Sequence, residues 1–179
     1  GMGCRYYVGD WRNEQFYPES HAQMSWVDHT FFAPESLLDN QGRRIMWSWL
    51  MDEPRFGTRA SHGWSGTMSL PRVLSLGDDG LLRIDVPYEI EMLRGQPFAF
   101  EPATVEPGAG HDAGIASNSF ELCLELQAGG ADRYGVKVCV SPDGSEETLI
   151  QYSALEGALQ VDTRKAGPGA GAIESAPFE

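Results

Sequence analysis

Apolar and polar residues alternate with a period of two along residues 120–127, FELCLELQ, where Phe120 and three leucines face away from two glutamates. Strict alternation of this kind predicts a half-buried β-strand. Further apolar runs follow at residues 134–140, 147–153 and 158–163, with Ser-Pro-Asp-Gly as a turn after the first of them. Short hairpin-linked strands with one polar face predict a β-sandwich in the C-terminal part of the chain.

The N-terminal half carries a second set of predicted strands. Apolar and aromatic runs at residues 30–38, 43–51, 64–76 and 81–86 are separated by turn and loop residues, and no long helical pattern interrupts them. A short helix-like segment, PYEIEMLR, closes this region at Arg94. Strands joined by Gly/Asp turns at near-regular spacing predict an antiparallel all-β unit. Four such strands have the size of one blade of a β-propeller.

Two shorter regions have patterns of their own. Residues 5–18 predict two short aromatic strands around a turn at residues 10–14. Residues 101–117 are rich in Pro, Gly and Ala and have no periodicity, which predicts a linker or a long exposed loop.

Composition narrows the class of partner. The chain has 179 residues, of which 41% are hydrophobic, and its net charge is −13. Its mean hydropathy of −0.32, together with the lack of any apolar run near 18 residues, excludes a transmembrane helix. The negative charge argues against nucleic acid and anionic membranes as partners, because both require Lys and Arg on the protein. A neutral sugar is compatible with this charge but is not selected by it.

The cysteines and histidines indicate no metal site. Cys4, Cys123 and Cys139 lack the close spacing of metal ligands, and the four histidines are scattered. Cys123 and Cys139 lie in apolar strand patterns, which predicts buried free thiols. A cross-strand disulfide between them is the alternative. We expect neither a metal nor a cofactor.

Four motifs occur in order between residues 28 and 94: DHTFFAPESLLD, GRRIMWSW, GWSGTMSLPRVL and VPYEIEMLR. Together they resemble the shared pattern of the glycoside hydrolases of family 32, the invertase, levanase and inulinase group. Two positions depart from that pattern: Ser48 stands where the family usually has glycine, and Val73 where it usually has glutamate. Residues 147–153 and 158–163 are similar, more loosely, to runs in the family's C-terminal sandwich.

The resemblance implies an all-β fold: the last blade or blades of a five-bladed β-propeller, followed by part of a C-terminal β-sandwich. We expect residues 1–100 to form the propeller part, with the final blade at about 28–94. Residues 101–117 would be the linker and residues 118–179 the partial sandwich. Four sandwich strands alone would leave open edges, and the family's sandwich normally continues further, so we expect this chain to be incomplete.

The resemblance also implies hydrolysis of terminal fructosyl bonds in sucrose or fructans with retention of configuration. Such a reaction needs a carboxylate nucleophile and a carboxylic acid/base. In the family these lie in N-D-P-N-G and E-C motifs, and a third Asp, in R-D-P, binds substrate hydroxyls. None of these motifs occurs in the sequence. The resemblance therefore places the catalytic residues upstream, and we expect this chain alone to be inactive.

Asp28 and Trp49 are the substrate-lining candidates. The family's blade has its first strand at the central channel, which would place Asp28 at the pocket, where a carboxylate can accept hydrogen bonds from sugar hydroxyls. The indole face of Trp49 suits the C–H surface of a sugar ring. The alternatives are a turn-capping Asp28 and a core Trp49. A catalytic pair of Asp28 and Glu35 is not expected, because they are seven positions apart and a regular strand sends residues at an odd separation to opposite faces.

A second function remains open at this point. A non-catalytic carbohydrate-binding or interaction module, built on a β-sandwich and an aromatic-rich sheet, would bind sugar saturably without turning it over. All five tryptophans precede Arg94, so their fluorescence would report such binding. In both hypotheses the partner is a sugar, sucrose or a fructan, and neither nucleic acid nor a membrane takes part.

Overall fold

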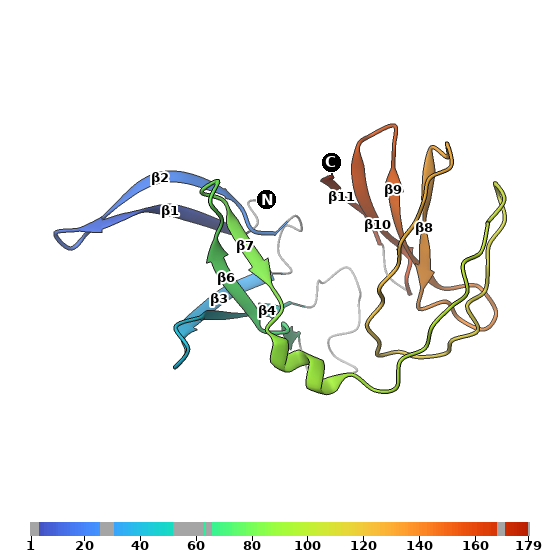
Figure 1. The fold of residues 1–179 in the computed structure, drawn as a ribbon, viewed down its shortest axis with the longest axis horizontal. Helices are drawn as coiled ribbons and strands as arrows, with labels where there is room; N and C mark the ends of the chain where they lie inside the picture. Colours follow the sequence, from blue (N-terminus) through green and yellow to red (C-terminus); the bar gives the residue numbers. More distant parts are fainter. Residues whose placement is uncertain (1–3, 26–30, 52–62, 64–65, 168–170, 179) are drawn as a thin grey trace. The chain divides into compact units, whose positions relative to one another are not determined.

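The computed structural model describes residues 4–25, 31–51, 63, 66–167 and 171–178. The chain divides into two compact units, residues 1–90 and residues 91–179 (Figure 1). Across the described residues both units are built from β-strands, with one short 3₁₀ helix between them in the sequence. The predicted all-β class is therefore confirmed. No helix in these ranges is long and apolar enough to span a membrane.

The strands pair only with antiparallel neighbours in the described part of the chain. In chain order the elements are β1 Arg5–Arg12, β2 Gln15–Gln23, β3 Phe31–Leu38, β4 Arg44–Leu50, β5 Thr67–Met68, β6 Arg72–Leu76, β7 Leu82–Asp85, the 3₁₀ helix η2 Tyr88–Leu93, β8 Arg133–Val138, β9 Glu147–Ser153, β10 Ala158–Lys165 and β11 Ile173–Pro177.

Strands β1 and β2 form a hairpin, as the aromatic pattern of residues 5–18 predicts. Asn13 and Glu14 connect the strands, with φ angles of 51° and 63°. Two consecutive residues with positive φ are typical of the type I′ turn, whose twist matches that of the flanking strands. Trp11 lies opposite Phe16 next to this turn. The hairpin prediction is confirmed, although β2 extends to Gln23, well beyond the predicted strand.

A second sheet has the strand order β3-β4-β6-β7, with β5 also paired to β4. Three of its strands agree with the predictions for residues 30–38, 43–51 and 81–86. Its central strand, β4, contributes Ile45 and Met46, which are 6% and 2% exposed. Neighbouring residues of a strand point to opposite faces. The sheet is thus covered on both faces at this position.

The predicted continuous strand over residues 64–76 is wrong. Two separate strands, β5 and β6, pair with β4 there, and Ser69, Leu70 and Pro71 lie between them. Proline has no N–H to donate to a neighbouring strand, so it interrupts the ladder. The Ser69 N–H still donates to the carbonyl oxygen of Ser48 at 2.8 Å, which keeps the two short strands aligned on the same neighbour.

The second unit contains one four-stranded sheet in the described residues, in the order β11-β10-β9-β8. Strands β8, β9 and β10 confirm the predictions for residues 134–140, 147–153 and 158–163, and β9 has the predicted bounds. Strand β11 was not predicted, because its five residues include a proline and follow a Gly/Ala-rich stretch. It pairs with β10, with Ile173 opposite Asp162 at one end and Pro177 opposite Ala158 at the other.

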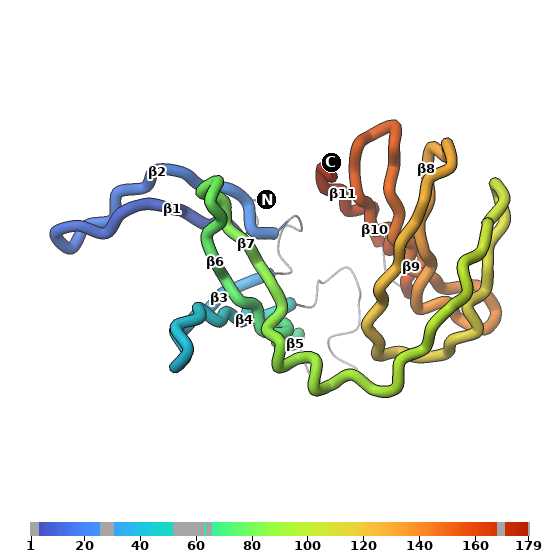
Figure 2. The backbone as a smooth tube through the Cα atoms, in the orientation of Figure 1, coloured from blue at the N-terminus to red at the C-terminus, as the bar shows by residue number. Residues whose placement is uncertain are grey.

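Residues 120–127 do not form the strand that their alternation predicts. This stretch lies in a long segment between η2 and β8 that has neither helix nor strand (Figure 1). Figure 2 traces the course of its backbone. Phe120 is 51% exposed and Leu124 is 48% exposed. Alternation sets which face a side chain takes, but a strand also needs a backbone partner, and the described residues supply none. Instead, Glu121 is held by an ion pair with Arg94, with an Nε–Oε2 distance of 2.6 Å.

The predicted burial of two thiols is also wrong. Cys123 and Cys139 are both exposed and free, so the alternative of a disulfide between them is not realised in this structure. Cys139 has a φ of 53° immediately after β8, where the strand has ended. Residues 101–117 contain no helix or strand, while the division into residues 1–100, 101–117 and 118–179 stays a prediction.

Candidate functional site

Of the two predicted substrate-lining residues, Asp28 lies outside the described residues, so its position stays a prediction. Trp49 lies in β4 and is 43% exposed. Its ring meets that of Phe32 edge-on, with centroids 6.2 Å apart and planes at 72°. On the other side Trp49 is paired with Met68 of β5. Trp49 is therefore a partly exposed side chain set between two neighbouring strands, not a buried core residue.

Gly66 supports the indole of Trp49 from a third direction. A Cβ atom built on Gly66 would collide with Nε1 of Trp49 and with the carbonyl oxygen of Leu50. Its φ of +72° also lies in the left-handed region that favours glycine. The backbone approaches the indole this closely because residue 66 has no side chain.

A β-bulge in β3 decides which side chains share a face with Trp49. Phe32 lies opposite Trp49 and Glu35 lies opposite Trp47, so three steps along β3 match two steps along β4. Ala33, inside the bulge, has a φ of 47°. One extra residue reverses the alternation. Phe32 and Glu35 consequently lie on the same face as the two tryptophans, although they are three positions apart.

Ser48 holds this bulge from the neighbouring strand. Its hydroxyl donates to the carbonyl oxygen of Phe32 at 2.8 Å, and its N–H donates to Oγ of Ser69 at 3.0 Å. The side chain is almost fully buried, with 2% of the residue exposed. Ser48 stands where the family usually has glycine, and its side chain gives the bulge a hydrogen bond that a glycine could not make.

The face carrying Trp49 contains a shallow depression with a volume of about 230 Å³. It is lined by Ala33, Glu35, Trp47, Ser48, Trp49 and Met68. Indole rings offer flat apolar surface to the C–H groups of a sugar, and a carboxylate can accept hydrogen bonds from its hydroxyls. The arrangement has the two kinds of group that a neutral sugar requires.

Arg43 organises the end of the same sheet. It makes two hydrogen bonds to Glu89, of 2.6 and 3.1 Å, and one of 2.8 Å from Nε to Asp39. Its guanidinium also lies 5.1 Å from the ring centroid of Tyr88. The network ties the β3–β4 turn to η2, and each guanidinium nitrogen of Arg43 contacts a carboxylate oxygen of Asp39 or Glu89. We assign Arg43 a structural role.

The ion pairs of Arg43 shift the titration of both carboxyl groups. The side-chain hydrogen bonds from Arg43 lower the pKa of Glu89 below its ordinary 4.5. For Asp39, desolvation acts to raise the pKa, but hydrogen bonds from Arg43 and from the Gln41 N–H outweigh it and lower the pKa below 3.8. Both groups are therefore held as carboxylates at neutral pH.

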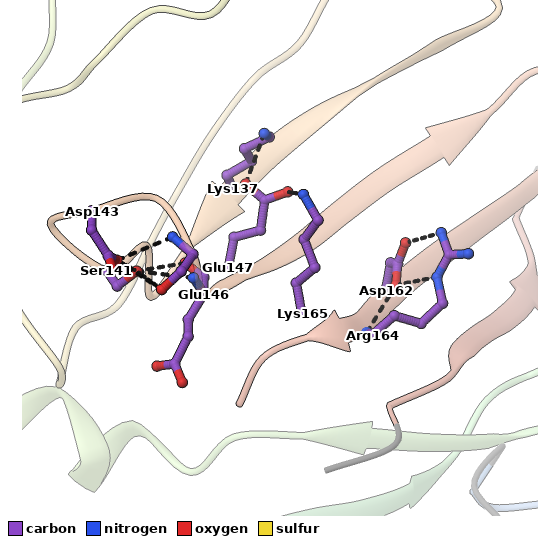
Figure 3. Close-up of polar contacts among 9 residues, drawn as sticks. Lys137, Ser141, Asp143, Glu146, Glu147, Asp162, Arg164 and Lys165 are labelled. Atoms are coloured by element: carbon purple, nitrogen blue, oxygen red, sulfur yellow. Dashed lines mark hydrogen bonds and ion pairs between the residues drawn. The ribbon is translucent and has the colours of Figure 1, made fainter. Parts of the chain in front are cut away.

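Polar contacts in the second unit form small local clusters (Figure 3). Glu147 of β9 lies between Lys137 of β8, at 2.8 Å, and Lys165 of β10, at 3.6 Å. Hydrogen bonds from the hydroxyls of Ser141 and Ser145 lower the pKa of Asp143 to about 2. These contacts join neighbouring strands or close a turn. No group of His, Cys, Asp and Glu in the described residues could hold a metal ion.

Two family models match consecutive parts of the chain. The N-terminal domain of glycosyl hydrolases family 32 matches residues 1–84, and the C-terminal domain of the same family matches residues 89–179. The chain belongs to glycosyl hydrolases family 32. The resemblance carried by the motifs at residues 28–94 is thereby confirmed.

Named members of family 32 are similar over different shares of the chain. Sucrose-6-phosphate hydrolase of Zymomonas mobilis is 28% identical over 175 residues, which cover 97% of this chain and 34% of the relative. Fructan 1-exohydrolase of Leymus chinensis is 34% identical over 99 residues, which cover 50% of this chain and 16% of that relative. The crystal structure of fructan 1-exohydrolase IIa from Cichorium intybus shares the fold, with a TM-score of 0.71 and 19% identity. The match covers 96% of this chain and 41% of that structure's chain. The chain thus spans about a third of the length of the first of these relatives.

Sequence reasoning identified Trp49 but missed two residues that share its depression. Trp47 was visible as the second tryptophan of the same strand, two positions away and hence on the same face. Glu35 was assigned its face by strict alternation, which fails across the bulge at Ala33. The Ala-Pro pair before Glu35 was the available signal, because proline within a strand is confined to edges and bulges.

Proposed function

We propose that this chain is the C-terminal part of a β-fructosidase that hydrolyses terminal fructosyl bonds of sucrose or fructans with retention of configuration. The observation that carries the proposal is the consecutive match of both family 32 domains over residues 1–84 and 89–179. Relatives named as hydrolases of sucrose 6-phosphate and of fructans support the substrate class.

In this proposal the sheet β3-β4-β6-β7 is the final blade of a five-bladed propeller, and the sheet β8–β11 is part of a sandwich. A blade is covered by other structure on both faces. The burial of both Ile45 and Met46, which point to opposite faces of β4, supports this assignment. The outer edges of the second sheet, β8 and β11, are unpaired among the described residues, which is consistent with further sandwich strands in the whole protein.

The catalytic carboxyl groups would lie upstream of this chain. A retaining glycosidase needs two of them about 5–5.5 Å apart, and the sequence contains no N-D-P, R-D-P or E-C motif. Coverage of 34% of the Zymomonas mobilis relative leaves ample length for such motifs in a longer protein. The contribution of this chain would be the edge of the sugar pocket, through Trp49 and, as predicted, Asp28.

Release of fructose from sucrose tests this proposal. We expect none from the 179-residue chain alone, and we expect the coding sequence immediately upstream to encode an N-D-P-type motif. Joining that upstream region to the chain should restore fructose release, and replacing its motif aspartate by asparagine should abolish it. Fructose release by the chain alone, above a buffer blank, would contradict the assignment of the reaction to upstream residues.

The alternative function, a carbohydrate-binding module without catalysis, is favoured by the depression beside Trp49. Trp47 and Trp49 both line it, so a bound sugar would change their fluorescence. Under this alternative the upstream region would be dispensable for sugar binding. Titration of the isolated chain with fructans distinguishes the two: saturable binding that the upstream region does not strengthen supports the module, whereas tighter binding on joining supports the enzyme.

A further inference from the structure

The depression beside Trp49 is lined in part by a negatively charged residue, Glu35. Among the residues that the structure describes, it is lined by Ala33, Glu35, Trp47, Ser48, Trp49 and Met68, which include one acidic residue and no Lys, Arg or His. Phosphate recognition in proteins relies on Arg, Lys or backbone N–H groups at a helix N-terminus. A sugar lying on these indoles would therefore meet a negative charge without a described cation to offset it.

Two features of the backbone place Glu35 in this depression. The bulge at Ala33 sets Glu35 directly opposite Trp47. The Ser48 hydroxyl, bonded to the Phe32 carbonyl oxygen at 2.8 Å, fixes the start of the bulge. From a strand position opposite Trp47, the carboxylate of Glu35 can reach and accept hydrogen bonds from hydroxyls of a sugar that stacks on the ring.

We propose that Glu35 is a specificity-determining residue that favours neutral sugars over phosphorylated ones, an inference that rests on the proposed sugar-binding role of this face. A phosphate monoester carries a charge of about −1.5 to −2 at neutral pH. Like charges a few ångströms apart, partly exposed to water, weaken binding by about threefold to tenfold. The relatives named above include hydrolases of a phosphorylated and of a non-phosphorylated sugar, and Glu35 assigns this chain to the second kind.

The test compares sucrose with sucrose 6-phosphate as ligands of the 179-residue chain, with tryptophan fluorescence or indole N–H shifts in NMR spectra as the signal. We expect sucrose to bind about threefold to tenfold more tightly than sucrose 6-phosphate. Glu35→Gln should remove most of that ratio by strengthening binding of the phosphorylated sugar. The matched control is Glu19→Gln, which removes the same charge from an exposed position in β2 and should leave the ratio unchanged.

Added salt provides a second measurement that needs no variant. Screening reduces repulsion between exposed charges, so the ratio should shrink as ionic strength rises. Glu35→Asp keeps the charge and should keep the preference, and thermal unfolding of each variant shows that it is folded.

Binding of both sugars with a ratio that Glu35→Gln leaves unchanged, or with sucrose 6-phosphate preferred, would overturn the inference while leaving the proposed function standing. If neither sugar binds, with or without the upstream region, both the inference and the proposed function are wrong. Should Glu35→Gln fail to fold, a salt-independent ratio in the unmodified chain would still overturn the inference.

Discussion

Glu35 lies directly across the β3–β4 ladder from Trp47, on the face of the sheet that also carries Trp49. Regular alternation from Phe32 would have placed this carboxylate on the opposite face. The bulge at Ala33 brings it to the tryptophans instead, and the hydroxyl of Ser48 binds the backbone at the start of that bulge. The face that carries the depression beside Trp49 therefore depends on one extra residue in one strand.

Replacing Ser48 by alanine should destabilise the first unit by about 1 kcal/mol, because it removes a buried hydrogen bond to the Phe32 carbonyl oxygen. Ser48→Gly, which restores the residue usual in the family, should cost a further 0.5–1 kcal/mol or so through backbone entropy. Urea unfolding followed by tryptophan fluorescence measures both. Ser75→Ala makes the same chemical change at an exposed strand position and should be nearly neutral. Equal effects at the two serines would refute the role of the bulge contact.

Replacing Gly66 by alanine should be severe. Both the positive φ of +72° and the collision with the Trp49 indole oppose a side chain there, and together they should cost about 2–4 kcal/mol. Gly63 is a close control, because its φ is +70° but no atom of the described residues lies within 4 Å of a Cβ built on it. Gly63→Ala should therefore cost only about 1 kcal/mol. Thermal unfolding of the two variants side by side gives the comparison, and similar losses would show that the indole contact is unimportant.

Replacing Arg43 by alanine should lower the thermal midpoint of the first unit by about 5 °C or more. The change breaks the paired hydrogen bonds to Glu89, the bond to Asp39 and the contact with Tyr88 at once. Arg43→Lys should recover little, because an ammonium group cannot reproduce the two parallel bonds. Arg44→Ala is the matched control, since that guanidinium is exposed and bonds to Oγ of Ser36. A midpoint as low for Arg44→Ala as for Arg43→Ala would contradict this prediction.

Acid should destabilise the first unit through the same network. Glu89 has a folded-state pKa below its ordinary 4.5, so its ion pair contributes fully above about pH 4.5 and is lost as the pH falls through the lowered value. The thermal midpoint should accordingly fall between about pH 5 and pH 3. Glu89→Gln should have a lower midpoint at pH 7 and a flatter dependence on acid. A variant that loses stability on acidification as steeply as the unmodified chain would show that Glu89 is not responsible.

Chymotrypsin should cleave first between η2 and β8. Phe98 and Phe120 are 66% and 51% exposed in a segment without helix or strand, so their backbone can enter a protease more easily than a paired strand can. Tyr7 is 57% exposed but lies within the paired strand β1, which makes it an internal control. Mass spectrometry of early fragments identifies the cuts. Early cleavage at Tyr7, with the segment intact, would mean that the hairpin opens more readily than the segment.

The sequence by itself determined the family, the all-β class and most strand positions. Residues 147–153 match β9 from end to end, because apolar periodicity and flanking turn residues are local properties of the chain. The motifs at residues 28–94 identified the family for the same reason, since each motif is a short run of neighbouring residues. What local patterns could not supply was the pairing of one segment with another.

Pairing is a tertiary property, and only the tertiary structure decided it. Residues 120–127 alternate as strictly as any strand, yet they remain unpaired because the described residues offer no backbone partner. Pro71 lies where the ladder with β4 is interrupted between β5 and β6, and it has no N–H to donate to a neighbouring strand. The face of Glu35 was settled by register with Trp47, which depends on how β3 and β4 align across the bulge rather than on the order of residues along either strand.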